Sequence, residues 1–268
     1  MPLSPRRVLK TFKYAMYFNG VNNYIVIPLV VYGWSGITIQ EWIYPFYPKA
    51  NNAWTKFSMI GDYWTDRPST FFGTDNRYDY TILDAAFVTR RSDGSVGWYS
   101  FSIFGYRNMW VNVVRRFDLS SRTYTGFINS NRIYTASISS TEYTILEWNP
   151  DTATYPQGYK QFVLGANVGG AGNMLMMQGN ILIYSRALSD SEIRWNYLYS
   201  DNPVRNGLVL WLKADPQYVK DIDGDGILEW IDLSGYNNHG KIYGAQLVQL
   251  IKTPVRVLKP VRVLKPAR

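Results

Sequence analysis

The sequence contains no cysteine and only one histidine, His239. Disulfide scaffolds, thiol nucleophiles and zinc sites built from cysteine and histidine are therefore excluded. Catalytic triads and metalloprotease motifs that need a cysteine or two histidines are excluded as well. His239 itself stands in the sequence Asn-Asn-His-Gly, which favours a turn or packing residue over a catalytic base.

Long apolar runs are also missing. No stretch approaches the roughly 18 consecutive apolar residues that span a bilayer, because Pro28, Gly33 and Gly36 interrupt the longest candidates. The first ten residues include basic residues, but no apolar core and no small-residue cleavage site follow them. We therefore expect neither a membrane span nor a general secretory signal.

Aromatic residues, by contrast, are abundant. They make up 16% of the chain, apolar residues make up 46%, and charged residues only 18%. This composition excludes global disorder. The length of 268 residues suits one large sandwich with a substantial core.

The positive charge is concentrated at the two ends of the chain. Ten basic residues and no acidic residue lie in segments 1–13 and 252–268. They are Arg6, Arg7, Lys10, Lys13, Lys252, Arg256, Lys259, Arg262, Lys265 and Arg268. Without these ten charges the net charge of +8 becomes −2 for the body. Any binding of a polyanion is therefore expected from the tails alone.

Short β-prone runs separated by Gly, Asn, Asp and Pro fill the chain from Tyr14 to about Ile183. This spacing predicts an all-β protein, an antiparallel sandwich or barrel. The runs are 24–28, 37–43, 97–103, 110–114, 124–128 and 161–164. One short helix is expected near 189–198, because Ser189 is followed by Glu192 in the pattern of a capping box.

Four segments together resemble the laminin-G-like, concanavalin-A-like jelly-roll family. They are YAMYFNGVNNYIVIP (14–28), ITIQEWIYP (37–45), ILIYSRALSDSEI (181–193) and DLSGYNNHG (232–240). In such domains a strand like GLVLWL (207–212) and a turn like Asp232-Leu-Ser-Gly usually precede the Phe-Asn-Gly strand, whereas here they follow it. The resemblance therefore implies a circularly permuted jelly-roll β-sandwich.

This interpretation gives a domain organisation. Segment 1–13 is a basic N-terminal tail, 14–251 is a single sandwich that 207–251 completes, and 252–268 is a basic C-terminal tail. The alternative is a truncated second domain, which would leave apolar strand edges open. The hexad PVRVLK occurs at 254–259 and 260–265, and PRRVLK at 5–10. Proline every six residues predicts extended tails that dock onto a partner or a sheet edge; an unstructured basic tail is the alternative.

The sharpest chemical motif runs from Asp221 to Asp232. Read as a calcium loop, it offers ligands at positions 1, 3, 5, 7, 9 and 12 and Gly226 at position 6. The ligands would be Asp221, Asp223, Asp225, the Ile227 carbonyl, Glu229 and Asp232. No helices flank the motif, so it predicts an isolated structural Ca²⁺ loop; a solvated Asp/Gly turn is the alternative.

Neither catalysis nor glycan binding has an unambiguous motif. Glucanases of this fold type carry paired acidic residues on one strand, and no such run exists here, so we expect no enzyme. Glu41, Glu142, Glu147 and Glu192 each stand apart. Aromatic side chains in 51–80 could stack on sugars, or they could fill the core or an interface. These glycan-binding candidates are Trp54, Tyr63, Trp64, Tyr78 and Tyr80.

The chain resembles structural proteins of archaeal viruses in three features: the permuted sandwich, the repeated tails and the lack of a secretory signal. This resemblance implies a virion protein whose tails dock onto copies of itself or other capsid proteins. The tail-docking residues would be Arg6, Arg7, Lys10, Arg256, Lys259, Arg262, Lys265 and Arg268. A glycan-binding adhesion module, extracellular or on a cell surface, and a nucleic-acid packaging protein acting through the tails are the alternatives.

Overall fold

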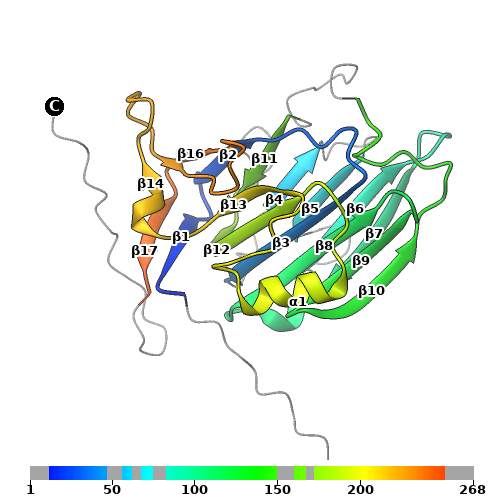
Figure 1. Cartoon of the computed structure of the whole chain (residues 1–268), viewed down its shortest axis with the longest axis horizontal. Helices are drawn as coiled ribbons and strands as arrows, with labels where there is room; N and C mark the ends of the chain where they lie inside the picture. Colours follow the sequence, from blue (N-terminus) through cyan, green and yellow to red (C-terminus); the bar gives the residue numbers. More distant parts are fainter. Residues whose placement is uncertain are drawn as a thin grey trace, which may run out of the picture.

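The described part of the protein is an all-β sandwich of two antiparallel sheets with one α-helix, as seen in a computed structural model (Figure 1). The structure describes residues 12–46, 56–61, 68–74, 83–149, 160–166 and 172–250. Within these ranges, the first sheet has the strand order β10-β9-β8-β3-β12-β1-β17, with β13 also paired to β12. The second sheet has the order β14-β15-β16-β2-β11-β4-β5-β6-β7.

The strands of the first sheet are β1 (Tyr14–Asn19), β3 (Gly36–Pro45), β8 (Val111–Asp118), β9 (Thr123–Ile128), β10 (Asn131–Ser137), β12 (Leu175–Tyr184), β13 (Leu208–Leu212) and β17 (Gln246–Gln249). Those of the second sheet are β2 (Tyr24–Pro28), β4 (Lys56–Gly61), β5 (Ser69–Thr74), β6 (Leu83–Arg90), β7 (Val96–Ser102), β11 (Gln161–Leu164), β14 (Val219–Lys220), β15 (Glu229–Trp230) and β16 (Gly240–Tyr243). The predicted runs 24–28 and 161–164 coincide with β2 and β11, and the fold class predicted from the sequence is confirmed.

Alternation along β3 shows how the layers form. Ile37, Ile39 and Ile43 point into the main core between the two sheets, whereas Trp42 belongs to a second cluster on the outer face of the first sheet. Successive side chains of a strand point to opposite faces, so both faces of β3 are covered. All ten residues of β3 are buried.

The helix α1 (Asp190–Leu198) covers that outer face (Figure 1). The predicted capping box is present: Ser189 Oγ accepts the amide of Glu192, and the Glu192 carboxylate accepts the amide of Ser189. Ile193 packs into the same cluster as Trp42 and anchors the helix on the sheet. The helix therefore occupies the sheet face beside β3.

Segment 207–250 contributes strands to both sheets. β17 pairs with β1, with Tyr14 opposite Gln249, and β16 pairs with β2. The amide of Leu250 also donates to the carbonyl of Lys13 at 2.8 Å. The two ends of the sandwich therefore lie side by side, as a permuted domain requires, and the domain boundaries stay a prediction.

Candidate functional site

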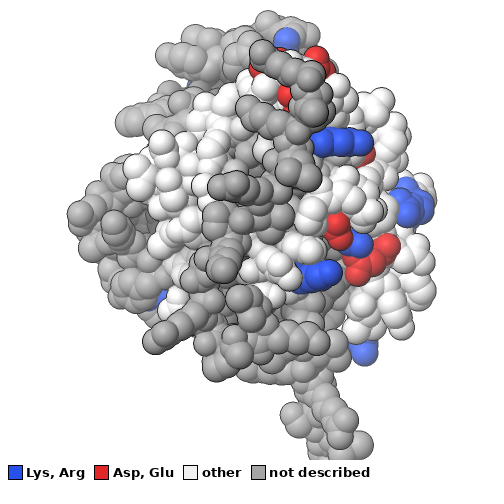
Figure 2. Space-filling model, turned by 90° about the vertical axis from the view of Figure 1, so that its left-hand side faces the viewer, with Lys and Arg blue, Asp and Glu red and all other residues white. Residues whose placement is uncertain are grey.

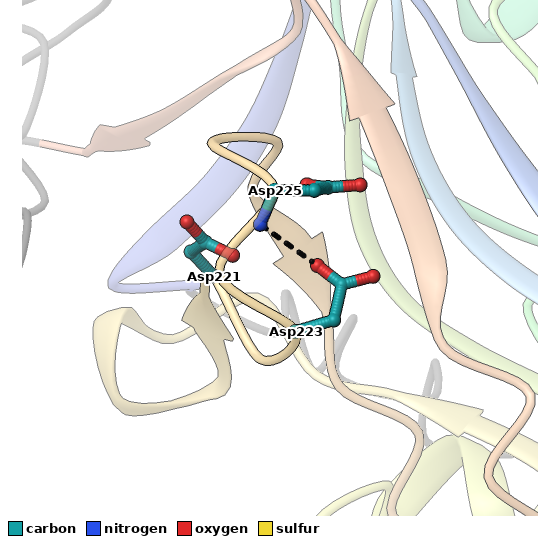
Figure 3. A group of neighbouring side chains, drawn as sticks. All are labelled: Asp221, Asp223 and Asp225. Atoms are coloured by element: carbon teal, nitrogen blue, oxygen red, sulfur yellow. Dashed lines mark hydrogen bonds between the residues drawn. The ribbon is translucent and has the colours of Figure 1, made fainter.

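The three aspartates predicted to open a calcium loop are gathered in the turn between β14 and β15. One carboxylate oxygen from each of Asp221, Asp223 and Asp225 lies within 4.8 Å of the others (Figure 3). Gly224 and Gly226 have φ of +77° and +87°, which lets the turn close tightly. The amides of both glycines donate to the Asp221 carboxylate at 2.8 and 3.0 Å. Convergent carboxylates of this kind fit a hard cation.

A lysine on the neighbouring strand already neutralises part of this charge. Lys241 Nζ lies 2.7 Å from Oδ2 of Asp225 and 3.1 Å from Oδ2 of Asp223. The hydrogen bond from Lys241 lowers the pKa of Asp225, and the two aspartates raise the pKa of Lys241. Any metal ion at this turn would compete with the ammonium group for Asp223 and Asp225.

Asp232, predicted as the last ligand, does not belong to this cluster. Both oxygens of Asp232 are engaged in the following turn: Oδ1 accepts the amides of Trp211 and Ser234, and Oδ2 accepts the amide of Asn238 and the Ser234 hydroxyl. The amide of Asp232 in turn donates to Nδ1 of His239 at 3.0 Å. Asp232 and His239 are thus positioned to hold the turn.

Glu229 lies on β15, directly opposite Lys241 in the strand register. Its side chain is buried, and within the described ranges its Oε2 has no hydrogen-bond partner. It does not belong to the group of converging oxygens. Ile227 contributes its amide to Asp225 Oδ1 at 2.8 Å. Among the predicted side-chain ligands, the three carboxylates of Asp221, Asp223 and Asp225 therefore converge, with Lys241 beside two of them.

Charges around the turn are mixed in sign. Figure 2 shows the side of the molecule that carries β14 and β17, where acidic and basic side chains lie close to one another among the described residues. Surface ion pairs of this kind are screened by solvent and contribute little to stability. The described part of this face offers no large field of one sign.

Glu41, one of the glutamates that stand apart in the sequence, is buried between the two sheets. Its Oε2 lies 2.5 Å from Nη2 of Arg115 on β8 and accepts the hydroxyl of Ser58 on β4 at 2.9 Å. Arg115 also reaches Thr70 on β5 at 3.3 Å. Glu41 is 0% and Arg115 2% exposed, so the pair is closed to a substrate. Both residues belong to the first sheet, and their bonds to Ser58 and Thr70 link the pair to the second sheet.

The other three glutamates that stand apart in the sequence are also bound to arginines. Glu142 accepts hydrogen bonds from Thr89, Arg91 and Tyr99. Burial works to raise the pKa of Glu142, but these hydrogen bonds together lower it below its ordinary value. In the same way Glu147 binds Arg122 at 2.9 Å and Glu192 binds Arg186 at 2.5 Å. These four carboxylates stabilise the fold.

The other predicted sites lie outside the described residues. This holds for the glycan-stacking candidates Trp54, Tyr63, Trp64, Tyr78 and Tyr80. It also holds for the tail-docking residues Arg6, Arg7, Lys10, Arg256, Lys259, Arg262, Lys265 and Arg268. Within the described ranges, no helix has the length and apolar character to cross a membrane.

Comparison with known proteins gives matches of structure and none of sequence. No family model and no curated protein matches the chain. A Bacteroides ovatus protein for which carbohydrate binding is proposed has a similar structure, with 16% identity and a TM-score of 0.61 over 95% of this chain and 63% of that one. This chain thus spans about 63% of the length of that protein.

Two further structures are similar over a smaller part. The heptameric SAP-like pentraxin of Limulus polyphemus has 13% identity and a TM-score of 0.46, covering 72% of this chain and 84% of its own. The CBM40 of a Ruminococcus gnavus sialidase, bound to sialyllactose, has 15% identity and a TM-score of 0.46, covering 68% and 96%. Together with the two antiparallel sheets, the Bacteroides match confirms the jelly-roll fold; at this identity it shows the fold alone.

Proposed function

We propose that this chain is a carbohydrate-binding module without catalytic activity, the adhesion alternative raised by the sequence. One observation carries the proposal: the sandwich shares its fold, over 95% of the chain, with the Bacteroides ovatus protein for which carbohydrate binding is proposed. An aromatic content of 16% supports it, since aromatic faces can stack against the apolar faces of sugars.

The state of the glutamates supports a binding role. A glycosidase needs a pair of carboxylates that reach the substrate, one of them free to donate a proton. Glu41 is enclosed with Arg115, and Glu142, Glu147 and Glu192 each bind an arginine. Breaking one of these pairs to free an acid would cost stability. We place the module outside the cell or on a surface, where glycans are displayed.

A glycan array probed with the full-length chain tests this function. We expect binding to a restricted set of oligosaccharides, and we expect Trp64→Ala to weaken it if the loops of 51–80 contribute. Inactivity of the same preparation on a polysaccharide panel separates binding from hydrolysis. Failure to bind any oligosaccharide or polysaccharide on the array and panel would contradict the proposal.

The repeated tails favour a second proposal, that the chain assembles with copies of itself or with other proteins of a virion. Three related hexads carry Val, Leu, Arg and Lys in extended-prone segments, and linked docking arms would make such an assembly multivalent. Particle mass of the full-length chain, compared with a chain lacking 1–10 and 253–268, tests it. Assembly that needs the tails and no nucleic acid supports it. A tail-dependent shift of DNA that weakens steeply with salt favours packaging instead.

A further inference from the structure

The exposed face of α1 ends in an aromatic pair. Trp195 is 46% and Tyr199 52% exposed, and Leu198 between them is 43% exposed. The buried positions of α1 are Ile193 and Asn196. Because residues four apart lie on one face of a helix, Trp195 and Tyr199 stand together on the side that faces away from the sheet.

The pair is held in a fixed arrangement. The two ring centroids are 4.5 Å apart with an interplanar angle of 44°. Trp195 Nε1 donates to the carbonyl of Asn202 at 3.0 Å, and the amide of Asn202 donates to the carbonyl of Tyr199 at 2.8 Å. The indole is thus tied to the chain segment that follows the helix, which reduces the entropy lost when a ligand stacks on it.

Hydrogen-bonding groups border the rings. The last intrahelical bond runs from the amide of Tyr199 to the carbonyl of Trp195. Among the described residues, no backbone amide bonds to the carbonyl of Leu198 near the helix end; such a terminal carbonyl can accept a hydrogen bond from a ligand. The exposed residue Asn202 bonds through its backbone to both residues of the pair. The Leu198 carbonyl and Asn202 therefore provide polar groups at the border of a small apolar surface.

We propose that Trp195 and Tyr199 form a stacking platform for one pyranose ring of a glycan, which rests on the proposed carbohydrate-binding function. A sugar presents an apolar face of C–H groups and a rim of hydroxyls, matching an aromatic surface with a polar border. A stable protein partner would need about 20 to 30 residues on each side. Among the described residues, the apolar surface of this helix end consists of three exposed side chains, the size of a site for one ring.

Titration of four full-length variants tests the platform, using the oligosaccharide that binds wild type most strongly on a glycan array. Trp195→Ala and Tyr199→Ala remove the rings, and Trp195→Phe keeps a flat ring. Tyr143→Ala is the matched control, since Tyr143 is 53% exposed on a different segment. We expect Trp195→Ala and Tyr199→Ala to bind about tenfold more weakly, while Trp195→Phe and Tyr143→Ala stay within about threefold of wild type.

The possible outcomes distinguish failure of the proposed platform from failure of the proposed carbohydrate-binding function. If wild type binds and both alanine variants bind equally well, the platform is wrong and carbohydrate binding stands, with Trp64→Ala pointing to the other predicted region. If wild type binds nothing, the proposed function fails and the platform with it. If the alanine variants lower the molecular mass in light scattering and leave glycan affinity unchanged, the surface is a protein interface. Melting temperatures of all variants exclude loss through unfolding.

Discussion

The ammonium nitrogen of Lys241 lies 2.7 Å from Oδ2 of Asp225, on the edge of the predicted calcium loop. Lys241 belongs to β16 and Asp225 to the turn before β15, so the chain itself brings a counter-charge to the acidic cluster. A divalent ion would have to displace this ammonium group or share the carboxylates with it. We therefore expect the Ca²⁺ affinity of the predicted loop to depend on Lys241.

Replacing Lys241 tests the predicted Ca²⁺ loop. We expect Ca²⁺ to raise the melting temperature of the full-length chain, because a ligand of the folded state stabilises it. Lys241→Gln should enlarge this rise, and Asp223→Asn should abolish it. Thermal unfolding in about 5 mM CaCl₂, which exceeds the dissociation constants of weak extracellular sites, compared with EDTA, measures the effect. Lys220→Gln, an exposed lysine on β14, is the control.

A melting temperature that does not change with Ca²⁺, in wild type and in Lys241→Gln, would contradict the predicted metal loop. The cluster would then be a solvated turn neutralised by Lys241.

Asp232 gives a separate prediction, because its carboxylate accepts four hydrogen bonds in the turn after β15. Asp232→Ala leaves buried amides such as that of Trp211 without an acceptor, so we expect a loss of about 3 kcal/mol in the free energy of unfolding. Urea denaturation measures it. The loss should be the same in CaCl₂ and EDTA; a loss that appears only with Ca²⁺ would make Asp232 a ligand after all.

Removing one partner of the buried pair of Glu41 and Arg115 should reduce the free energy of unfolding more than replacing both partners with apolar residues. Arg115→Met leaves a carboxylate uncompensated in the core, and we expect a loss of about 3 to 5 kcal/mol. Adding Glu41→Leu should recover part of this loss, because no buried charge then remains. Denaturant unfolding of the two single variants and the double variant tests this. A double variant as unstable as the sum of the singles would show that the pair is not coupled.

Acid should weaken the cap of α1 through Glu192. The hydrogen bonds from Arg186 lower the pKa of Glu192 to about 2, and the amide of Ser189 adds to this while partial burial opposes it. Because the folded pKa lies below the ordinary value of 4.5, the stabilisation is complete above that pH and is lost as the pH falls toward 2.

Glu192→Gln isolates this contribution. We expect the variant to be about 1 kcal/mol less stable than wild type at pH 7, a value discounted because the pair is partly exposed. The difference should shrink below pH 4.5 and vanish only below about pH 2, where the carboxyl group is protonated in both states. Stability measured against pH for both proteins checks the sign; a difference that grows in acid would contradict it.

Local patterns allowed much of the fold to be predicted. Proline and glycine bounded β2, and Ser189 with Glu192 marked the start of α1, because capping is decided within one helical turn. The predicted β-prone run 37–43 likewise lies within β3. These features depend on neighbours a few residues apart.

The site could be predicted only in part, because its decisive contacts are distant in sequence. Asp221, Asp223 and Asp225 converge as their spacing predicts, but Lys241 reaches them across the sheet from 16 residues away. Arg115 meets Glu41 across 74 residues. The four-residue spacing of Trp195 and Tyr199 at the predicted helix is visible in the sequence. That this side of the helix is exposed becomes clear only from the burial of Ile193 and Asn196.

A glycan array of the full-length chain tests the central claim, carbohydrate binding, most directly. The account predicts selective binding to a small group of oligosaccharides, retained by Tyr143→Ala and weakened by Trp195→Ala. No binding to any oligosaccharide by a folded, full-length preparation would contradict it.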